Sequence, residues 1–277
     1  MRSTLLAHLL AAVLFLTAAL PSIAEEQADS NDYHVLVKEG NQALARNDFH
    51  AASQLFQRAV DNNPSSAKAH EGLGIALFRE LAAGNVRVSS DTDVADRAET
   101  HLKQAASLSP GASRPLLELA DLEGFLASRS QDDQGRSDRY QQARNALQQA
   151  IALEPSHPEV YLRLANLERD EFGPVLEQAK ARYPKNAGPI PDASLRASLQ
   201  KRYLHLIDDA ISNAQRASEA NANSQRPLLL LSKLFRQRAL LRDTQEQYAT
   251  DMHTAADWEQ QFLSAGGHVA GQAENRP

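Results

Sequence analysis

Three acidic residues near position 91 have a spacing that resembles the start of a calcium-binding loop. Asp91, Asp93 and Asp96 lie close enough in sequence for their carboxylates to share a cation, and calcium is bound through such oxygen ligands in the EF-hand loop. That frame fails here, because it would need an oxygen ligand at Ala95 and a glycine where Asp96 stands. We therefore expect Asp93 to cap a helix that begins at Val94.

Other residue patterns typical of catalysis or metal binding are missing from the sequence. Asp132, Asp133 and Asp138 fail the calcium-loop test in the same way and indicate a solvated loop. The nine histidines form no HExxH pair, and no GxSxG, P-loop or GxGxxG sequence occurs. The absence of cysteine excludes disulfides, cysteine-ligated zinc, a thiol nucleophile and a lipidated N-terminal cysteine. The sequence predicts no enzyme activity, no catalytic residues, no metal site and no cofactor.

The composition indicates a helical protein. The chain has 277 residues and a net charge of −6, with 42% hydrophobic and only 5% aromatic residues. Alanine and leucine are abundant and β-branched residues are few, which favours an all-α fold over a β-sandwich. The negative net charge argues against general nucleic-acid binding, because that function needs a basic surface that releases counterions.

The first 24 residues have the pattern of a secretory signal peptide. Arg2 precedes a run rich in leucine, alanine and valine, which Pro21 closes. Ser22 and Ala24 provide the small residues that signal peptidase recognises. An uncleaved membrane anchor is the alternative, but the apolar run is short for a bilayer span. We expect cleavage before Glu25, no stable membrane insertion after cleavage, and an exported protein that is periplasmic or secreted.

Pairs of alanines recur at a fixed spacing along the rest of the chain. In each set the second alanine follows the first by seven residues, and a proline, or once Ala222, follows after five more. The sets are Ala52, Ala59 and Pro64; Ala98, Ala105 and Pro110; Ala143, Ala150 and Pro155; and Ala210, Ala217 and Ala222. Residues seven apart lie on one helix face, so these small side chains allow a neighbouring helix to approach closely. Each set predicts a helical hairpin that stacks on its neighbours to bury its apolar face.

The first of these units resembles a tetratricopeptide repeat. The resemblance is carried by Gly40, Asn41, Gln42, Ala43, Phe49, Ala52, Phe56, Ala59 and Pro64, in the family's usual frame of about 34 residues. It implies an all-α fold, an α-α superhelix or solenoid of about five helical hairpins, which binds a protein partner in its concave groove. The expected domains are a signal peptide at 1–24, a repeat domain at 25–264 and a flexible tail at 265–277. The expected units are 31–64, 67–110, 113–155, 158–222 and 225–264.

Most of the units are longer than the usual repeat, and turn-forming residues indicate where the extra residues lie. Segments 84–91 and 130–135 predict loops at hairpin tips. In the fourth unit, Pro174 is expected to begin a short helix that ends near Tyr183. The proline-rich segment 184–191 is then expected to form a rigid spacer or a lid over the groove.

Two capping patterns and a second resemblance mark the last two units. Asp192 is the expected N-cap of a helix over 193–220, and Thr244 and Gln247 have capping-box spacing. Segments 188–197 and 234–258 are similar to a group of exported bacterial tetratricopeptide proteins of undefined function. This second resemblance implies no activity.

The first helices of the units supply the candidate binding residues. Spacing from the packing positions places six polar or cationic side chains toward the groove: Asn41, Lys68, Arg114, Asn166, Lys233 and Arg236. Several are hydrogen-bond donors, which favours an acidic or C-terminal peptide ligand. The alternative is that they are ordinary solvated helix residues. The resemblance does not extend to a complete carboxylate clamp, because Val37, Glu71 and Ile75 stand where the family has clamp residues.

The arginines near the C-terminus have two possible roles. Arg236, Arg238 and Arg242 either pair with acidic residues at 243, 246 and 251 or face a ligand, and pairing is the expectation.

The favoured function is a non-catalytic interaction scaffold or adaptor of the bacterial cell envelope. The alternative is an accessory or ligand-capturing subunit of an envelope enzyme or export complex that uses segment 184–191.

Overall fold

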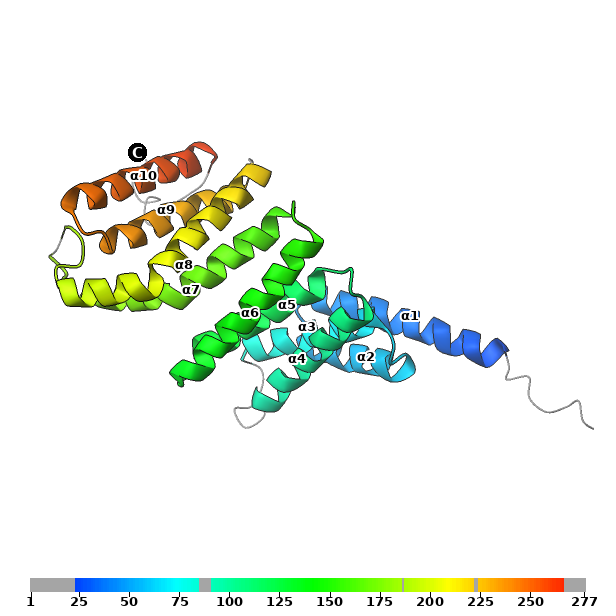
Figure 1. Ribbon diagram of the computed structural model, residues 1–277. Helices are drawn as coiled ribbons and strands as arrows, with labels where there is room; N and C mark the ends of the chain where they lie inside the picture. The colour runs from blue at the N-terminus through cyan, green and yellow to red at the C-terminus, as the bar shows by residue number, and fades with distance from the viewer. Residues whose placement is uncertain (1–22, 85–90, 186, 222–223, 267–277) are drawn as a thin grey trace, which may run out of the picture.

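A computed structural model of the chain describes residues 23–84, 91–185, 187–221 and 224–266. Within these residues the chain forms ten α-helices and no strand, arranged as five consecutive hairpins in a row (Figure 1). The helices are α1 (Ile23–Ala45), α2 (Phe49–Asn62), α3 (Ala67–Ala82), α4 (Asp91–Leu108), α5 (Arg114–Arg129), α6 (Asp133–Leu153), α7 (Pro158–Ala181), α8 (Ala193–Ala220), α9 (Gln225–Leu240) and α10 (Gln245–Ser264). The predicted all-α solenoid of helical hairpins is confirmed.

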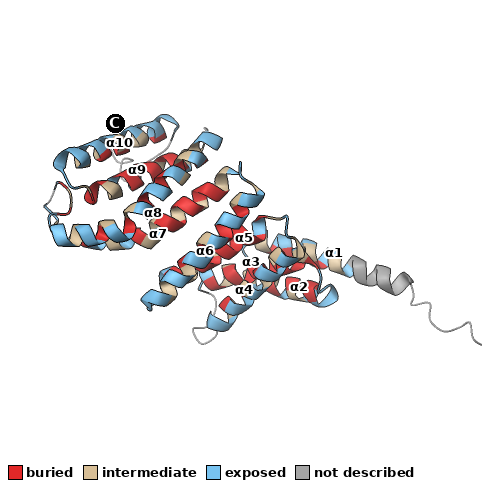
Figure 2. Cartoon of the chain, viewed as in Figure 1, coloured by how far each residue is buried: buried red, intermediate tan, exposed pale blue. Residues whose placement is uncertain are grey.

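The paired alanines are the close-packing points of this stack. Seven of the eight are completely buried and Ala217 is 2% exposed. The larger residues between them are buried as well: Phe56, Leu102 and Leu147. Figure 2 shows buried positions gathered on the helix faces that meet other helices. Small side chains at these positions let the backbones approach, and the larger residue fills the space beside the contact.

Phe56 shows how tightly the first three helices interlock. Its ring lies between two glycines, Gly40 on α1 and Gly72 on α3. A Cβ atom on Gly72 would lie 2.2 Å from Cε1 of Phe56, and one on Gly40 would lie 2.9 Å from Cε2. The ring therefore cannot move away from one glycine without meeting the other. Both positions require the absence of a side chain.

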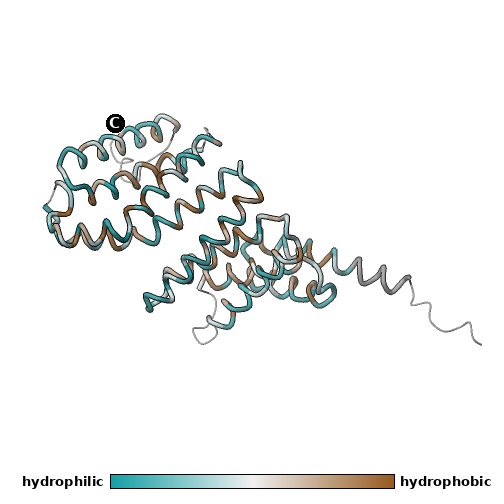
Figure 3. Tube along the Cα trace, in the orientation of Figure 1, coloured by the Kyte–Doolittle hydropathy of each residue, from teal (hydrophilic) through white to brown (hydrophobic). Residues whose placement is uncertain are grey.

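The buried apolar residues form two clusters that meet at α7. One cluster extends from α1 to α7 and contains Leu164, and the other extends from α7 to α10 and contains Leu162 and Ala165. Ile151 packs against both clusters. The apolar and polar residues alternate around each helix (Figure 3), as expected when one face of each helix is buried. Helix α7 is therefore the element that joins the two halves of the core.

Helix α7 contains the clearest departure from the sequence prediction. Pro174 does not begin a separate short helix but lies inside α7, which continues to Ala181. Proline has no N–H group, so the carbonyl of Asp170, one turn earlier, lacks its helical donor. The hydroxyl of Tyr140 on α6 donates to that carbonyl at 3.0 Å. Burial raises the pKa of Tyr140 to about 12, which keeps its proton in place. A partner outside the helix thus satisfies the carbonyl that proline leaves without a donor.

The helix starts in the last two units follow the predicted capping residues. Helix α8 covers the predicted span, and Oδ1 of Asp192 accepts a hydrogen bond from the backbone N–H of Leu195 at 2.9 Å. At α10, the Thr244 hydroxyl accepts from the N–H of Gln247 at 3.2 Å. The Gln247 side chain accepts in return from the N–H of Asp243 at 3.2 Å. These contacts fix where both helices begin.

Three other boundaries differ from the prediction. Asp93 is not an N-cap, because α4 begins at Asp91 and includes it. The predicted loop 130–135 is shorter, since Asp132 caps α6 by accepting from the N–H of Gly135 at 2.6 Å. Helix α1 begins at Ile23, well before the expected unit start at residue 31. At α4 and α6 the helix includes residues that the sequence prediction had placed in a loop or at a cap.

The proline-rich segment between α7 and α8 is held against the end of α9. Ile190 is 2% exposed, and its N–H donates to the carbonyl of Leu240 at 2.9 Å. The Arg196 guanidinium donates to the Ile190 carbonyl at 2.5 Å. These contacts make the described part of the segment a brace between the fourth and fifth hairpins rather than a free lid.

Most of the predicted signal peptide and tail lie outside the described residues. Cleavage before Glu25 and a flexible tail at 265–277 stay predictions. Across the residues that the structure describes, no helix is long and apolar enough to span a bilayer.

Candidate functional site

A groove runs over the first helices of the last four hairpins, α3, α5, α7 and α9. It contains two adjoining cavities, which we call the central pocket and the basic pocket. The central pocket, of about 730 Å³, is lined chiefly by α3, α5 and α7. The basic pocket, of about 500 Å³, lies between α7 and α9. Both are lined by Asp170 and Pro174, so the two pockets form one groove with the middle of α7 between them.

One wall of the central pocket is apolar and aromatic. Phe78 on α3 and Phe125 on α5 make an edge-to-face contact, with ring centroids 5.7 Å apart. Arg79 lies over the Phe78 ring at 4.9 Å. Gly124 leaves space beside them, because a Cβ atom there would lie 3.0 Å from Cδ1 of Leu167. Such a wall can hold an apolar side chain of a ligand next to charged groups.

Ion pairs between neighbouring first helices line the groove. The Arg79 guanidinium lies 2.9 Å from the Glu118 carboxylate and so joins α3 to α5. Arg163 pairs with Asp121 and joins α7 to α5. Two more pairs link first helices near their starts: Arg114 Nε with Glu71 Oε1 at 3.1 Å between α5 and α3, and Arg226 Nη1 with Glu159 Oε2 at 3.0 Å between α9 and α7. The arginines of the central pocket therefore already have carboxylate partners within the chain.

Two of these carboxylates are partly desolvated. Burial raises the pKa of Asp121 to about 6, although the neighbouring Arg163 acts in the opposite direction. Burial also raises the pKa of Glu71, against the effect of Arg114. Desolvation of these carboxylates therefore offsets part of the electrostatic gain of their ion pairs.

Comparison with known proteins identifies the repeat. The family model described as tetratricopeptide repeat matches residues 37–83 and 132–173. The chain is a tetratricopeptide repeat protein. No curated protein matches its sequence.

Solved structures of other tetratricopeptide proteins share the fold at low sequence identity. A crystal structure of MamA is 14% identical, with a TM-score of 0.53 over 90% of this chain and 100% of that one. MamA from residue 41 onward, from Desulfovibrio magneticus RS-1, is 12% identical, with a TM-score of 0.53 over 85% of this chain and 95% of that one. A thermophilic tetratricopeptide protein of Thermus thermophilus is 17% identical, with a TM-score of 0.51 over 84% and 98% of the two chains. At these identities the likeness shows the fold alone.

The structure brings together three of the six candidate residues. Asn166 lines the central pocket, and Lys233 and Arg236 line the basic pocket. The Asn166 amide donates to the Leu162 carbonyl at 2.8 Å. Arg236 pairs with Glu259 on α10, whereas Lys233 has no ion-pair partner among the described residues.

The other three candidates lie on first helices but outside these two pockets. Asn41 on α1 is exposed, and its amide donates to the Val37 carbonyl of its own helix at 2.8 Å. Lys68 is exposed at the start of α3, and Arg114 at the start of α5 pairs with Glu71. Their role as ligand contacts stays a prediction.

The sequence prediction did not include the residues that shape the two pockets. In the sequence, Phe78 and Phe125 cannot be distinguished from ordinary core residues on the apolar face of a helix. Arg169 and Lys180 line the basic pocket from α7. Lys180 lines this pocket because α7 continues through Pro174. The sequence prediction ended the helix before Pro174 and therefore did not place Lys180 in the groove.

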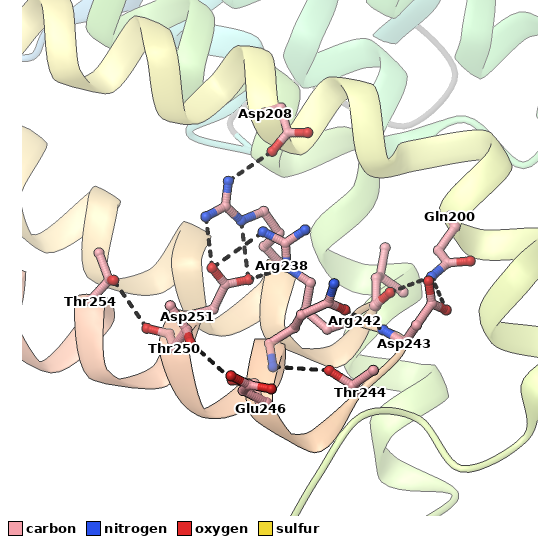
Figure 4. Close-up of polar contacts among 12 residues, drawn as sticks. Gln200, Asp208, Arg238, Arg242, Asp243, Thr244, Glu246, Thr250, Asp251 and Thr254 are labelled. Carbon is pink, nitrogen blue, oxygen red and sulfur yellow. Dashed lines mark hydrogen bonds and ion pairs between the residues drawn. The ribbon is translucent and has the colours of Figure 1, made fainter.

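Arg238 and Arg242, near the C-terminal end of α9, form ion pairs within the chain. Arg238 and Arg242 both donate to the buried carboxylate of Asp251 on α10, at 2.7 and 2.6 Å in their shortest contacts, and Arg238 also contacts Asp208 on α8 at 3.0 Å (Figure 4). Burial alone would raise the pKa of Asp251, but these hydrogen bonds outweigh it and hold the pKa below its usual value. The pairing expected for Arg238 and Arg242 is confirmed. The network joins α8, α9 and α10.

Proposed function

We propose that this tetratricopeptide protein is a non-catalytic scaffold that binds a segment of a protein partner in the groove over α3, α5, α7 and α9. The observation that carries the proposal is the continuity of the central and basic pockets across four first helices. The two pockets share Asp170 and Pro174. An extended segment can therefore contact both without leaving the groove.

The character of the groove supports a peptide rather than a buried small molecule as ligand. It combines the aromatic wall of Phe78 and Phe125 with charged groups from several helices. Both pockets are open to solvent instead of enclosed, whereas small-molecule sites generally bury most of the ligand. No cluster of three or more metal-ligating side chains occurs in the described ranges. These features suit binding better than catalysis.

We further propose that the protein acts after export, in the bacterial cell envelope. The support is the pattern of residues 1–24, with a positive start, an apolar run and small residues before Glu25. The lack of cysteine means that the chain needs no oxidative folding in that compartment.

The alternative, an accessory subunit that uses segment 184–191 as its contact element, has less support. Ile190 is buried and bonded to Leu240, so the central part of the segment already has an internal partner. The exposed residues among those described in the segment are Pro184, Lys185, Ala187 and Pro191.

The proposal is tested by blocking the groove without changing the core. Ser128 is exposed and lines the central pocket, and Gln148 on α6 is equally exposed but lies on a second helix. Capture of envelope proteins is compared for the wild type, Ser128→Trp and the matched control Gln148→Trp. Loss of the same captured protein with Ser128→Trp alone supports groove binding. Equal capture by the wild type and both tryptophan variants rejects it. Loss of capture only in a fourth protein, Lys185→Glu, favours the alternative.

A further inference from the structure

We propose that the basic pocket binds an acidic side chain, aspartate or glutamate, of the peptide segment that occupies the groove. This inference rests on the proposed function and adds to it the chemistry that one part of the partner must have. It depends on three features of the pocket: its unpaired cations, its unpartnered polar atoms and its connection to the central pocket.

The first feature is an excess of positive charge in a protein whose net charge is −6. The pocket is lined by four cations, Arg169, Lys180, Lys233 and Arg236, and by two carboxylates, Asp170 and Glu177. Arg169 and Arg236 each have an ion-pair partner.

The remaining two cations are available to a ligand. Lys180 on α7 and Lys233 on α9 are exposed, and neither has an ion-pair partner in the described part of the chain. The central pocket differs, because each of its arginines is paired with a carboxylate. Of the two pockets, only the basic pocket has lining cations without an ion-pair partner among the described residues, and its one unpaired carboxylate, Glu177, offsets only part of their charge.

The second feature is a pair of polar atoms without partners. Among the described residues, Nε of Arg169 and Oε1 of Gln237 are buried and make no hydrogen bond. Both residues line the pocket. Gly173 allows the Gln237 amide to lie close to α7, since a Cβ atom there would be 3.3 Å from Nε2 of Gln237. A buried donor and acceptor without partners are costly, and a ligand that supplies both relieves that cost.

A peptide with an acidic side chain meets these requirements together. Its carboxylate accepts from the ammonium groups of Lys180 and Lys233 and from the N–H of Arg169. Its backbone N–H groups can donate to Oε1 of Gln237. Leu240 and the ring of Pro174 provide apolar surface for the methylene groups of the same side chain.

The third feature distinguishes a side-chain carboxylate from a chain terminus. The basic pocket continues past Pro174 into the central pocket, so a segment can pass through it rather than end in it. A residue further along the same segment can then lie in the central pocket, which the rings of Phe78 and Phe125 line. We infer an internal acidic residue with an apolar residue nearby in the bound sequence.

Binding of defined peptides to the purified full chain tests the inference. The probes are fluorescein-labelled peptides of repeated Gly-Asp-Leu units and of repeated Gly-Asn-Leu units, both with blocked ends, and the Gly-Asn-Leu peptide with a free carboxyl terminus. Fluorescence anisotropy gives their Kd values at low and high salt. We expect the aspartate peptide to bind about tenfold or more tightly than the blocked asparagine peptide, with an advantage that shrinks in high salt.

Charge reversal locates the contact. The double variant Lys180→Glu and Lys233→Glu should lose the preference for the aspartate peptide. The control Lys201→Glu, an exposed lysine on α8, should keep it. Equal binding of the aspartate and blocked asparagine peptides, or equal loss in the control, overturns the inference. If the asparagine peptide with a free carboxyl terminus binds more tightly than the aspartate peptide, the pocket binds a chain terminus instead.

The outcome can be separated from that of the proposed function. If the double reversal changes nothing while Ser128→Trp still blocks partner capture, the groove function holds and the acidic-side-chain inference fails. If Ser128→Trp has no effect on capture, the groove function itself fails. Light scattering of the purified chain gives its oligomeric state, and a dimer that Ser128→Trp converts to a monomer would place a second copy in the groove and also contradict a separate acidic partner.

Discussion

Replacing Gly72 with alanine should destabilise the first two hairpins through a single contact. The new Cβ atom would lie 2.2 Å from Cε1 of Phe56, and the ring is blocked on its other side by Gly40, where a Cβ atom would lie 2.9 Å away. Strain of this kind costs about 1–3 kcal/mol, and the upper part of that range applies because the ring has nowhere to move. Alanine gains about 1 kcal/mol over glycine in a helix. The expected net loss is about 2 kcal/mol.

Thermal unfolding followed by far-UV circular dichroism measures this effect. For a chain of this size a loss of about 2 kcal/mol lowers the Tm by roughly 4–8 °C. The control is Gly111→Ala, because no atom lies within 4 Å of the Cβ position at Gly111. The control should change the Tm by no more than about 2 °C.

A double-mutant cycle shows whether Phe56 is the cause. Phe56→Leu alone creates space and should destabilise the protein, but in the Gly72→Ala background it should cost less or restore stability. Simple additivity of the two changes, or a Gly72→Ala variant as stable as the wild type, would refute the packing argument.

Three further variants test other parts of the structure. Tyr140→Phe should cost about 1–2 kcal/mol because it leaves the Asp170 carbonyl without a donor; chemical denaturation should show a smaller cost in a Pro174→Ala background, and an equal cost in both backgrounds would contradict this role. Asp251→Asn should cost about 3 kcal/mol, since two arginines lose their shared buried carboxylate, and hydrogen exchange should then show faster opening of α10; unchanged exchange would argue against the network. Burial raises the pKa of Glu168 from 4.5 to about 7, so the folded state holds its proton over a range where the unfolded state has lost it. The free energy of unfolding should fall by at most about 3 kcal/mol as the pH rises from 4.5 to 7. In Glu168→Gln the free energy of unfolding should change less over this pH range. The same pH dependence in the variant and the wild type would show that another group titrates.

The packing of the repeat could be predicted from sequence because it depends on side-chain size at fixed spacing. The alanine pairs and the larger residues between them are at the buried contacts that the spacing required. The start of α8 at Asp192 could be predicted for the same reason, since capping is a local interaction between one side chain and a nearby backbone N–H.

The continuity of α7 could not be predicted locally. Proline normally ends a helix, and only the hydroxyl of Tyr140, from another helix, compensates for the N–H that Pro174 lacks. The basic pocket depends on that continuity, because Lys180 comes after Pro174. A local rule was therefore overridden by a tertiary contact, and a functional candidate was missed as a result.

The groove residues were only partly predictable, because type and spacing do not reveal pairing. Arg114 was expected to face a ligand, yet Glu71 on the neighbouring helix lies 3.1 Å from it. The same spacing rule points to Lys233, which has no such partner in the described residues. The difference arises between helices of adjacent repeats, which the sequence of one repeat does not contain.

Site-specific photo-crosslinking tests the central claim most directly. A benzophenone amino acid is placed in the groove, at Ser128 or Lys233, and on exposed second-helix positions, at Gln148 or Lys201, and the protein is irradiated in envelope extract. The groove account predicts crosslinks to the same partner protein from Ser128 and Lys233 and none from Gln148 and Lys201. Crosslinks confined to the second-helix positions would contradict it.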